Sequence, residues 1–323
     1  MVIRASAALR INYLEYFYRY GLYFVFLLLV VTFSAITPKF YGISNIINIL
    51  QQSAAAGIAV VGMSFVILTA GIDLSIGSTM CIAAITTAYL SGAGWGLIPC
   101  ILVSLLCGGL IGAFNGFLIS RWKVVPFIVT LAVQITIRGI ISAITGQSLI
   151  YFTGPTQEML TQTMIVSIPI ITWIFIVIIA AGHYVLIRTA FGRQLYAIGN
   201  NASAAEKVGL NVRRNLFLVY LIAGAMAGLS GLISSVQVAS VTPEFGKGSE
   251  FLVISAAVLG GVSLFGGKGN IFPGALIGVL IITCIENGLV LVGADPYSYT
   301  IVRGLVIFLA VMVDCIRNKG ELR

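Results

Sequence analysis

Long apolar runs, separated by short polar or glycine-rich segments, dominate the pattern of hydrophobic and polar positions along the chain. A helix that crosses the hydrocarbon core of a bilayer needs about 20 predominantly apolar residues. The pattern therefore predicts an all-helical membrane protein with a single transmembrane domain over residues 1–323. Ten membrane-spanning helices are expected, at 21–37, 54–71, 76–91, 97–119, 126–145, 163–187, 215–238, 250–265, 271–291 and 298–315.

The composition excludes a water-soluble protein. Hydrophobic residues make up 59% of the chain and charged residues only 9%, with a mean hydropathy of +1.08, whereas a soluble domain carries about 25% charged residues. Residues 1–24 are basic and precede an apolar run, as in a secretory signal peptide, but they show no clear small-residue cleavage site. We therefore expect the first helix to be retained as a membrane anchor.

Basic residues gather on one side of the expected membrane. The net charge is +8, but these residues form no dense run of the kind that binds nucleic acid. With the N-terminus in the cytoplasm, the outer segments hold only Lys39 and Lys247. Both termini are therefore expected inside, since short cytoplasmic loops retain basic residues. The cytoplasmic segments hold fourteen of them: Arg4, Arg10, Arg19, Arg121, Lys123, Arg188, Arg193, Lys207, Arg213, Arg214, Lys268, Arg317, Lys319 and Arg323.

The order of the spans suggests an inverted repeat, and one long apolar region is interrupted by a polar segment. Spans 2–5 and 7–10 are two blocks of four that enter the membrane from opposite sides, the arrangement expected of an inverted repeat. Between the second and third spans, the segment TAGIDLSIGST (69–79) interrupts a long apolar region. Non-helical backbone at membrane depth is tolerated only where protein or a water-filled cavity satisfies it. This segment is therefore either a short cytoplasmic turn or a broken helix.

The longest hydrophilic interruption is the expected cytoplasmic segment 188–215. A bare turn between helices needs only a few residues. Residues 202–208 predict a short helix, because Asn200 or Asn201 and Ser203 can cap its start and Gly209 can end it. A helix across the cytoplasmic face would dock another protein, and the alternative is a long ordered loop without a partner.

We expect no catalytic, metal or cofactor site in the chain. The stretch 260–270 has Gly261 and Gly266 at the spacing of a phosphate-binding loop, but Gly267 stands where lysine is required. There is no Ser-His or His-Glu-His arrangement, and the only histidine, His183, cannot build a metal site alone. The cysteines show no ligand spacing and are expected to be packing residues: Cys81, Cys100, Cys107, Cys284 and Cys315.

Four ionisable residues lie within or between the expected spans, where a charge costs about 2.5–3.5 kcal/mol. Asp73 could order its segment by accepting amide hydrogen bonds or help to gate the cytoplasmic mouth, and the alternative is an ordinary turn aspartate. Arg138 lies about twelve residues into its span, so it is either a hydrogen-bond hub facing the bundle or a substrate contact. Glu286 and Arg303 lie on adjacent antiparallel spans and are expected to pair. The alternative for this pair is proton coupling.

Neutral polar residues in the spans either line a path for a hydroxyl-rich solute or form hydrogen bonds between helices. They include Gln51, Gln52, Asn115, Gln134, Gln237 and Asn287. Taken with the ionisable residues, they give a set of candidate gating or translocation-path residues: Asp73, Ser75, Gln134, Arg138, Glu286, Asn287 and Arg303.

Five separated runs resemble one known family. They are NIINILQQSAAAGIAVVGMSFVILTAGIDLSIGS (45–78), VPFIVTLAVQITIRGI (125–140), FGRQLYAIGNNASAAEKVGLNV (191–212), ISAAVLGGVSLFGGKGNIFPGALIG (254–278) and ENGLVLVGADPYSYTIVRGLVIFLAVMVD (286–314). In order and spacing they closely resemble the ribose-type permeases of bacterial ABC sugar importers, within the branched-chain amino acid/ribose-type permease superfamily. Glu286 departs from that pattern, in which an uncharged residue, often Asn, is expected.

The resemblance implies the permease subunit of an inner-membrane importer of a ribose-like pentose or a hexose. Its implied partners are a second permease subunit, either a copy or a paralogue, cytoplasmic ATPase subunits that bind ATP and Mg, and a periplasmic sugar-binding protein. The ATPase-coupling loop, at about 188–214, would include Gly192, Arg193, Tyr196, Ala197, Gly199, Asn200, Ala204, Ala205, Glu206, Lys207 and Gly209.

The leading hypothesis is alternating access in which ATP hydrolysis in partner subunits pushes on the 191–212 loop. The alternative hypothesis is a secondary transporter of a small polar solute, powered by an ion gradient. Asp73, Arg138 and Glu286 are the residues that could serve it.

Overall fold

The computed structural model describes residues 13–318. Its helices are α1 (Tyr13–Ile36), η1 (Pro38–Tyr41), α2 (Ile43–Leu68), α3 (Ile76–Gly92), α4 (Leu97–Trp122), α5 (Pro126–Thr145), α6 (Pro155–Gln162), α7 (Ile170–Arg188), α8 (Ala190–Asn200), α9 (Ala202–Lys207), α10 (Val212–Val238), α11 (Ser249–Leu259), η2 (Ile271–Ala275), α12 (Leu276–Leu291) and α13 (Pro296–Asn318). Short antiparallel strands pair as β1 (Ile150–Tyr151) with β4 (Ser240–Val241), and as β2 (Met164–Ile165) with β3 (Ile168–Pro169).

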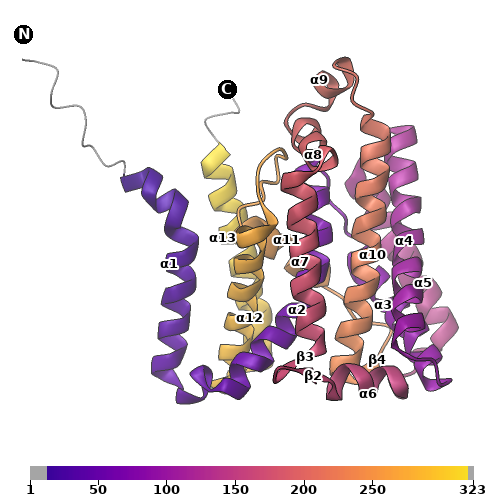
Figure 1. Cartoon of the computed structure of the whole chain (residues 1–323), viewed down its shortest axis with the longest axis vertical. Helices are drawn as coiled ribbons and strands as arrows, with labels where there is room; N and C mark the ends of the chain where they lie inside the picture. The colour runs from indigo at the N-terminus through magenta and orange to yellow at the C-terminus, as the bar shows by residue number, and fades with distance from the viewer. Residues whose placement is uncertain (1–12, 319–323) are drawn as a thin grey trace, which may run out of the picture.

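The long helices run side by side between two ends of the bundle (Figure 1). Helices α8 and α9 lie at one end, whereas α6, β2, β3 and β4 lie at the opposite end (Figure 1). Helix α1 stands at one edge of the bundle, and α4 and α5 stand at the other (Figure 1). The segment expected to face the cytoplasm is thus separated from the segments expected outside by the length of the bundle.

Six of the described helices are long and apolar enough to cross a membrane: Ile43–Leu68, Leu97–Trp122, Pro126–Thr145, Ile170–Arg188, Val212–Val238 and Ile271–Leu291. The four other expected spans correspond to shorter apolar helices, namely Gly21–Ile36, Ile76–Gly92, Ser249–Leu259 and Tyr297–Met312. The prediction of an all-helical, multi-pass membrane protein is confirmed. The expected location of the chain ends concerns residues 1–12 and 319–323, which lie outside the described part.

Several expected spans differ from the helices at their ends, and α1 begins at Tyr13 rather than at 21. Helix α2 begins at Ile43 rather than at 54, because the polar residues after Ile43 include no helix breaker before Gly57. Helix α7 begins at Ile170 rather than at 163, because a β2–β3 hairpin occupies 164–169. Helix α11 ends at Leu259 rather than at 265, where Gly260 and Gly261 follow.

Helices α4 and α10 approach each other backbone to backbone. A Cβ atom at Gly108 would overlap with the carbonyl oxygen of Gly224, and a Cβ atom at Gly228 would overlap with the carbonyl oxygen of Ser104. Packing rather than hydrophobicity drives helix association in lipid, so such contacts between small residues hold the bundle together. Both helices therefore form a closely packed pair in one half of the molecule.

The same neighbour relations occur in both blocks of four spans. In the first block, α3 packs against α4 and α5, and α10 covers α3 and α4. In the second block, α11 packs against α12 and α13, and α2 covers α11 and α12. The two blocks also meet directly, since the first turn of α3 touches the segment before α11: a Cβ atom at Gly77 would overlap with the carbonyl oxygen of Gly246.

The interruption between the second and third spans is a buried turn. Residues 69–75 are not helical, and both Asp73 and Ser75 are 1% exposed. Helix α3 then runs back along the bundle, because Ser91 at its far end donates a hydrogen bond to the Thr153 carbonyl beside α6. The turn joins two antiparallel helices and is enclosed by protein, as backbone outside a helix must be at this depth.

Candidate functional site

The hydrophilic segment after α7 folds into two helices with side-chain caps. The Thr189 hydroxyl accepts a hydrogen bond from Gly192 N at the start of α8, and Asn201 Oδ1 accepts one from Ala204 N at the start of α9. Gly209, with a φ of 86°, follows the second helix. These caps satisfy amides that a helix start leaves unpaired. The predicted helix at 202–208 is confirmed as α9, whereas α8 was not predicted.

The α8–α9 segment has an inner and an outer face. Gly192, Leu195, Ile198 and Gly199 are buried at helical spacing on α8, and Ala205 is buried on α9. The outer face is exposed and carries most of the expected coupling residues: Arg193, Ala197, Asn200, Ala204, Glu206, Lys207 and Gly209. We call these seven residues the docking surface. Gly192, Gly199 and Ala205 instead belong to the inner face.

The inner face of α8 touches the bundle without intervening side chains. A Cβ atom at Gly199 would overlap with the carbonyl oxygen of Leu68 and with Gly267 N. The half-buried Tyr196 hydroxyl donates a 2.7 Å hydrogen bond to the Gly269 carbonyl. Burial raises the pKa of Tyr196 above its usual value, so the hydroxyl keeps its proton and donates throughout the physiological pH range. Tyr196 therefore points into the protein rather than toward a partner.

Asp73 and Ser75 organise the buried turn. Asp73 Oδ1 accepts hydrogen bonds from Ser75 N (2.8 Å) and from Ser75 Oγ (2.6 Å). Asn115 Nδ2, on α4, donates to Ser75 Oγ at 2.8 Å. The carboxylate thus accepts a backbone amide, as in the first of the two roles expected for it. Tyr220, fully buried on α10, places its hydroxyl beside Gly71 in the same turn.

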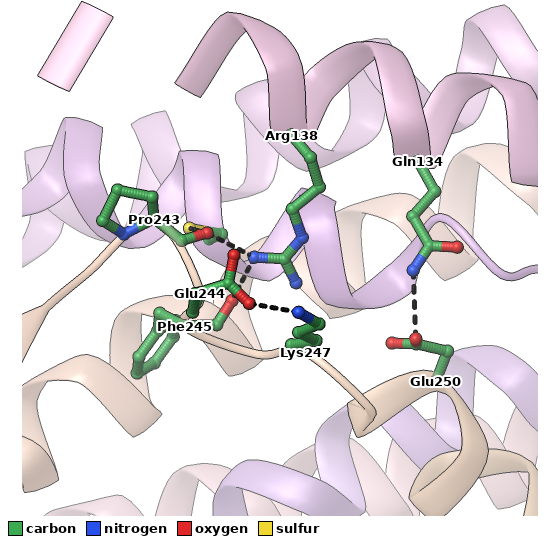
Figure 2. Close-up of polar contacts among 8 residues, drawn as sticks. Gln134, Arg138, Pro243, Glu244, Phe245, Lys247 and Glu250 are labelled. Carbon is green, nitrogen blue, oxygen red and sulfur yellow. Dashed lines mark hydrogen bonds and ion pairs between the residues drawn. The ribbon is translucent and has the colours of Figure 1, made fainter. Parts of the chain in front are cut away.

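Arg138 and Gln134 connect α5 to the segment 243–250 (Figure 2). Arg138 Nη1 donates hydrogen bonds of 2.7 Å to the carbonyls of Pro243 and Phe245. Gln134 Nε2 donates to Oε1 of Glu250, which is only 4% exposed, at 3.0 Å. Arg138 Nη2 and Glu250 Oε2 are buried without a protein hydrogen-bond partner. Arg138 therefore makes the hydrogen bonds expected of a hub that faces the bundle.

Glu250 is the member of this cluster that the sequence analysis did not identify. The sequence offered one signal, a carboxylate at the start of an apolar run, where an unpaired charge would be costly. Its neighbour Glu244 pairs instead with Lys247 at 2.5 Å on the surface, and this hydrogen bond lowers the pKa of the Glu244 carboxyl. An exposed pair of this kind contributes little stability.

Replacement of Arg138 by glutamine is expected to destabilise the protein by about 3 kcal/mol or more. A neutral and shorter side chain loses charge-assisted hydrogen bonds to two carbonyls, each bond of this type being worth about 1.5–3 kcal/mol. Thermal unfolding of the purified protein in detergent measures the effect. Arg121→Gln is the control, because Arg121 is exposed in the last turn of α4. Equal unfolding temperatures for both variants would contradict the role of Arg138 as a hub.

The expected pair Glu286–Arg303 is confirmed. Arg303 Nη2 lies 2.5 Å from Glu286 Oε1, and Arg303 Nε donates to the same oxygen at 3.1 Å. About one third of each side chain is exposed. The pair lines a small pocket between α11, α12 and α13 together with Ser255 and Tyr299. Both groups are thus neutralised by each other, which lowers the cost of holding them at this position.

Other polar residues mostly connect helices. Asn45 Nδ2 donates to Asn287 Oδ1 at 2.9 Å, and Gln237 Nε2 donates to the Gln51 carbonyl at 2.7 Å. His183 packs edge-on against Phe272. Within the described residues, no group of three or more His, Cys, Asp or Glu side chains has the arrangement of a metal site. All five cysteines are free thiols.

Comparison with known proteins assigns the family. The profile of the branched-chain amino acid transport system / permease component family matches residues 45–311. The chain belongs to this family. Its matched range includes the buried turn, the α8–α9 segment and the Arg138 cluster. The protein is thus a multi-pass permease component of a transport system and not an enzyme in its own right.

Curated relatives share most of their length with this permease. It is 38% identical over 302 residues to the ribose import permease protein RbsC of Escherichia coli (strain K12), covering 91% of this chain and 92% of the relative. It is 32% identical over 317 residues to the D-allose transport system permease protein AlsC, with 98% and 97% covered. The xylose transport system permease protein XylH is 33% identical over 335 residues, with 84% of each covered. No solved structure matches.

Proposed function

We propose that this permease is the membrane-spanning subunit of an ATP-driven importer of a monosaccharide, a ribose-like pentose or a hexose, in the bacterial inner membrane. One observation carries the proposal: the α8–α9 segment presents an exposed docking surface at one end of the bundle, while its buried face packs directly on α2. The names of the ribose, allose and xylose relatives support a sugar as the substrate.

The proposed topology is ten crossings with both chain ends in the cytoplasm. The ten apolar helices and the excess of basic residues on the α8–α9 side support it. The matched neighbour relations of α2–α5 and α10–α13 support an inverted repeat. We further propose that the whole chain acts as one transmembrane domain, from which residues 188–214 project into the cytoplasm as the coupling loop.

The proposed partners follow from the family. A cytoplasmic ATPase subunit that binds ATP and Mg would occupy the docking surface, and a periplasmic protein would deliver the sugar. A second permease subunit, identical or paralogous, would complete the passage. Neutral and basic side chains dominate the docking surface, with Glu206 as its only carboxylate. We therefore expect a change of charge at Glu206 to weaken docking more than a change of charge at any other residue of this surface.

We also propose that two polar clusters close the passage in the conformation described. One consists of Gln134, Arg138 and Glu250, and the other of Asp73 and Ser75. Contacts of Gln134 and Arg138 tie α5 to residues 243–250 at the outer side, and Asp73 and Ser75 tie the buried turn to Asn115 on α4. Opening toward either side would require these hydrogen bonds to break. Glu286, Asn287 and Arg303 lie on α12 and α13, where their pairing supports a structural part in the wall of the path.

Charge reversal at Glu206 tests the proposed function. Glu206→Lys is expected to reduce ATP-dependent sugar uptake to background, because the exposed helix α9 would present a cation where its partner meets a carboxylate. Membrane insertion should be preserved, since the side chain is exposed. The measurement is D-ribose, D-allose and D-xylose uptake by proteoliposomes that contain the permease, its ATPase and its binding protein, together with co-purification of the ATPase.

Glu158→Lys is the matched control, because Glu158 is exposed on α6 at the opposite end of the bundle. This variant should retain the bound ATPase. Normal uptake by Glu206→Lys would contradict docking at α9. Uptake that persists without ATP and collapses with an uncoupler would instead show a secondary transporter powered by an ion gradient.

A further inference from the structure

Residues 260–270, the glycine loop, contact three separate parts of the bundle although they belong to neither the docking surface nor the polar clusters. The loop is closed on itself by hydrogen bonds from Ser263 N to the Lys268 carbonyl (2.9 Å) and from Gly266 N to the Ser263 carbonyl (3.0 Å). Gly266 and Gly267 have φ values of 82° and 67°, a region that favours glycine. Its shape is therefore specified by contacts within the loop itself.

On one side, the glycine loop is joined to α8. The Tyr196 hydroxyl donates a 2.7 Å hydrogen bond to the Gly269 carbonyl. Gly267 lies directly under the end of α8, because a Cβ atom at Gly199 would overlap with Gly267 N. No flexible side chain separates the two backbones at this point, so a displacement of α8 reaches the loop without being absorbed.

On the other side, the loop is joined to α2 and α13. Gly267 N donates a 2.9 Å hydrogen bond to the Leu68 carbonyl at the end of α2, directly before the buried turn that contains Asp73. Leu264 N donates to Asp314 Oδ2, on α13, at 3.0 Å, and Ser263 Oγ lies 3.4 Å from the same oxygen. The ends of the loop continue into α11 and η2. One segment thus reaches helices of both blocks.

We propose that the glycine loop transmits movement of α8 to α2 and α13, and that Tyr196 and Asp314 are positioning residues of the transport cycle. This inference rests on the proposed function, because it needs an ATPase that moves α8. Hydrogen bonds to backbone atoms are directional, so a displaced α8 pulls on the loop through Tyr196 and the loop pulls on α13 through Asp314. Docking and transmission are then carried by opposite faces of α8–α9.

Two conservative substitutions test this role. Tyr196→Phe removes only a hydroxyl, and Asp314→Asn keeps the shape of the side chain while removing its charge. In the complete importer in proteoliposomes, with D-ribose as the probe, we expect uptake to fall about fivefold, the factor that one ordinary hydrogen bond represents. ATP hydrolysis should fall less, so more ATP is consumed per sugar transported. Tyr184→Phe is the control, because Tyr184 is 63% exposed.

The ratio of ATP hydrolysed to sugar transported decides the outcome. An unchanged ratio in the variants, whether both rates fall together or neither falls, overturns the proposal. Tyr196→Phe and Asp314→Asn act on opposite sides of the loop, and Ser263→Ala is a third variant that removes one hydroxyl, so a folding defect in one leaves the others to decide. Failure of the unaltered permease to co-purify with its ATPase would refute the proposed function instead.

Discussion

Replacement of Gly199 by alanine is expected to reduce ATP-dependent sugar import by about 5- to 150-fold. The added methyl group would overlap with backbone atoms of Leu68 and Gly267, and backbone cannot move aside as a flexible side chain can. Overpacking of this kind costs about 1–3 kcal/mol. A cost of this size lowers the population of permease with α8 packed against α2 by about 5- to 150-fold. Helix α8 would have to move away from α2, and the docking surface would move with it.

Uptake of D-ribose by the reconstituted importer measures this effect, and the amount of permease in the membrane serves as the check on insertion. Gly139→Ala on α5 is the matched control, because a Cβ atom at Gly139 would meet no other atom within 4 Å. It should transport at the unaltered rate. Wild-type uptake by Gly199→Ala would show that close contact between α8 and α2 is not needed for coupling.

The second large effect is expected where α4 meets α10. Gly108→Ala should destabilise the permease by about 1–3 kcal/mol, because the methyl group would overlap with the backbone carbonyl of Gly224. In lipid, close approach of backbones is a main source of helix association. The change is measured by thermal unfolding of the purified permease in detergent. Unfolding is monitored as the loss of monodisperse protein.

The neighbouring glycine supplies the control for this experiment. A Cβ atom at Gly109 would come no closer than 3.9 Å to Ala225, an ordinary van der Waals contact. Gly109→Ala should therefore unfold at the temperature of the unaltered protein or slightly above it, because alanine favours a helix. If the two variants unfolded alike, the close approach of α4 and α10 would be refuted as a source of stability.

Local signals in the sequence were sufficient for the long apolar helices, for α9 and for one ion pair. The capping residue Asn201 and the terminating Gly209 predicted α9, because both act through the backbone of their own segment. Glu286 and Arg303 were predicted to pair because adjacent antiparallel spans bring them together and charges in lipid need a partner. Helix ends were placed less well, since the hairpin before α7 depends on pairing rather than on hydropathy.

Long-range contacts were beyond the sequence. Glu250 accepts a hydrogen bond from Gln134, which lies more than 100 residues earlier, and Asp314 accepts one from the Leu264 amide of the glycine loop, 50 residues before it. Tyr196 was expected on the coupling surface, yet its hydroxyl points inward to Gly269. No periodicity or spacing along the chain encodes such pairings.

The sequence by itself determined that this protein lies in a membrane, which segments form its apolar helices and which long hydrophilic segment interrupts them. Those properties follow from hydropathy, helix capping and charge, which act over a few residues at a time. Only the tertiary structure decided that the turn around Asp73 is buried, that α8 has an exposed face and a face buried against the bundle, and that the glycine loop contacts α8, α2 and α13. Those properties depend on which backbone segments lie in contact. Packing of the whole bundle determines these contacts.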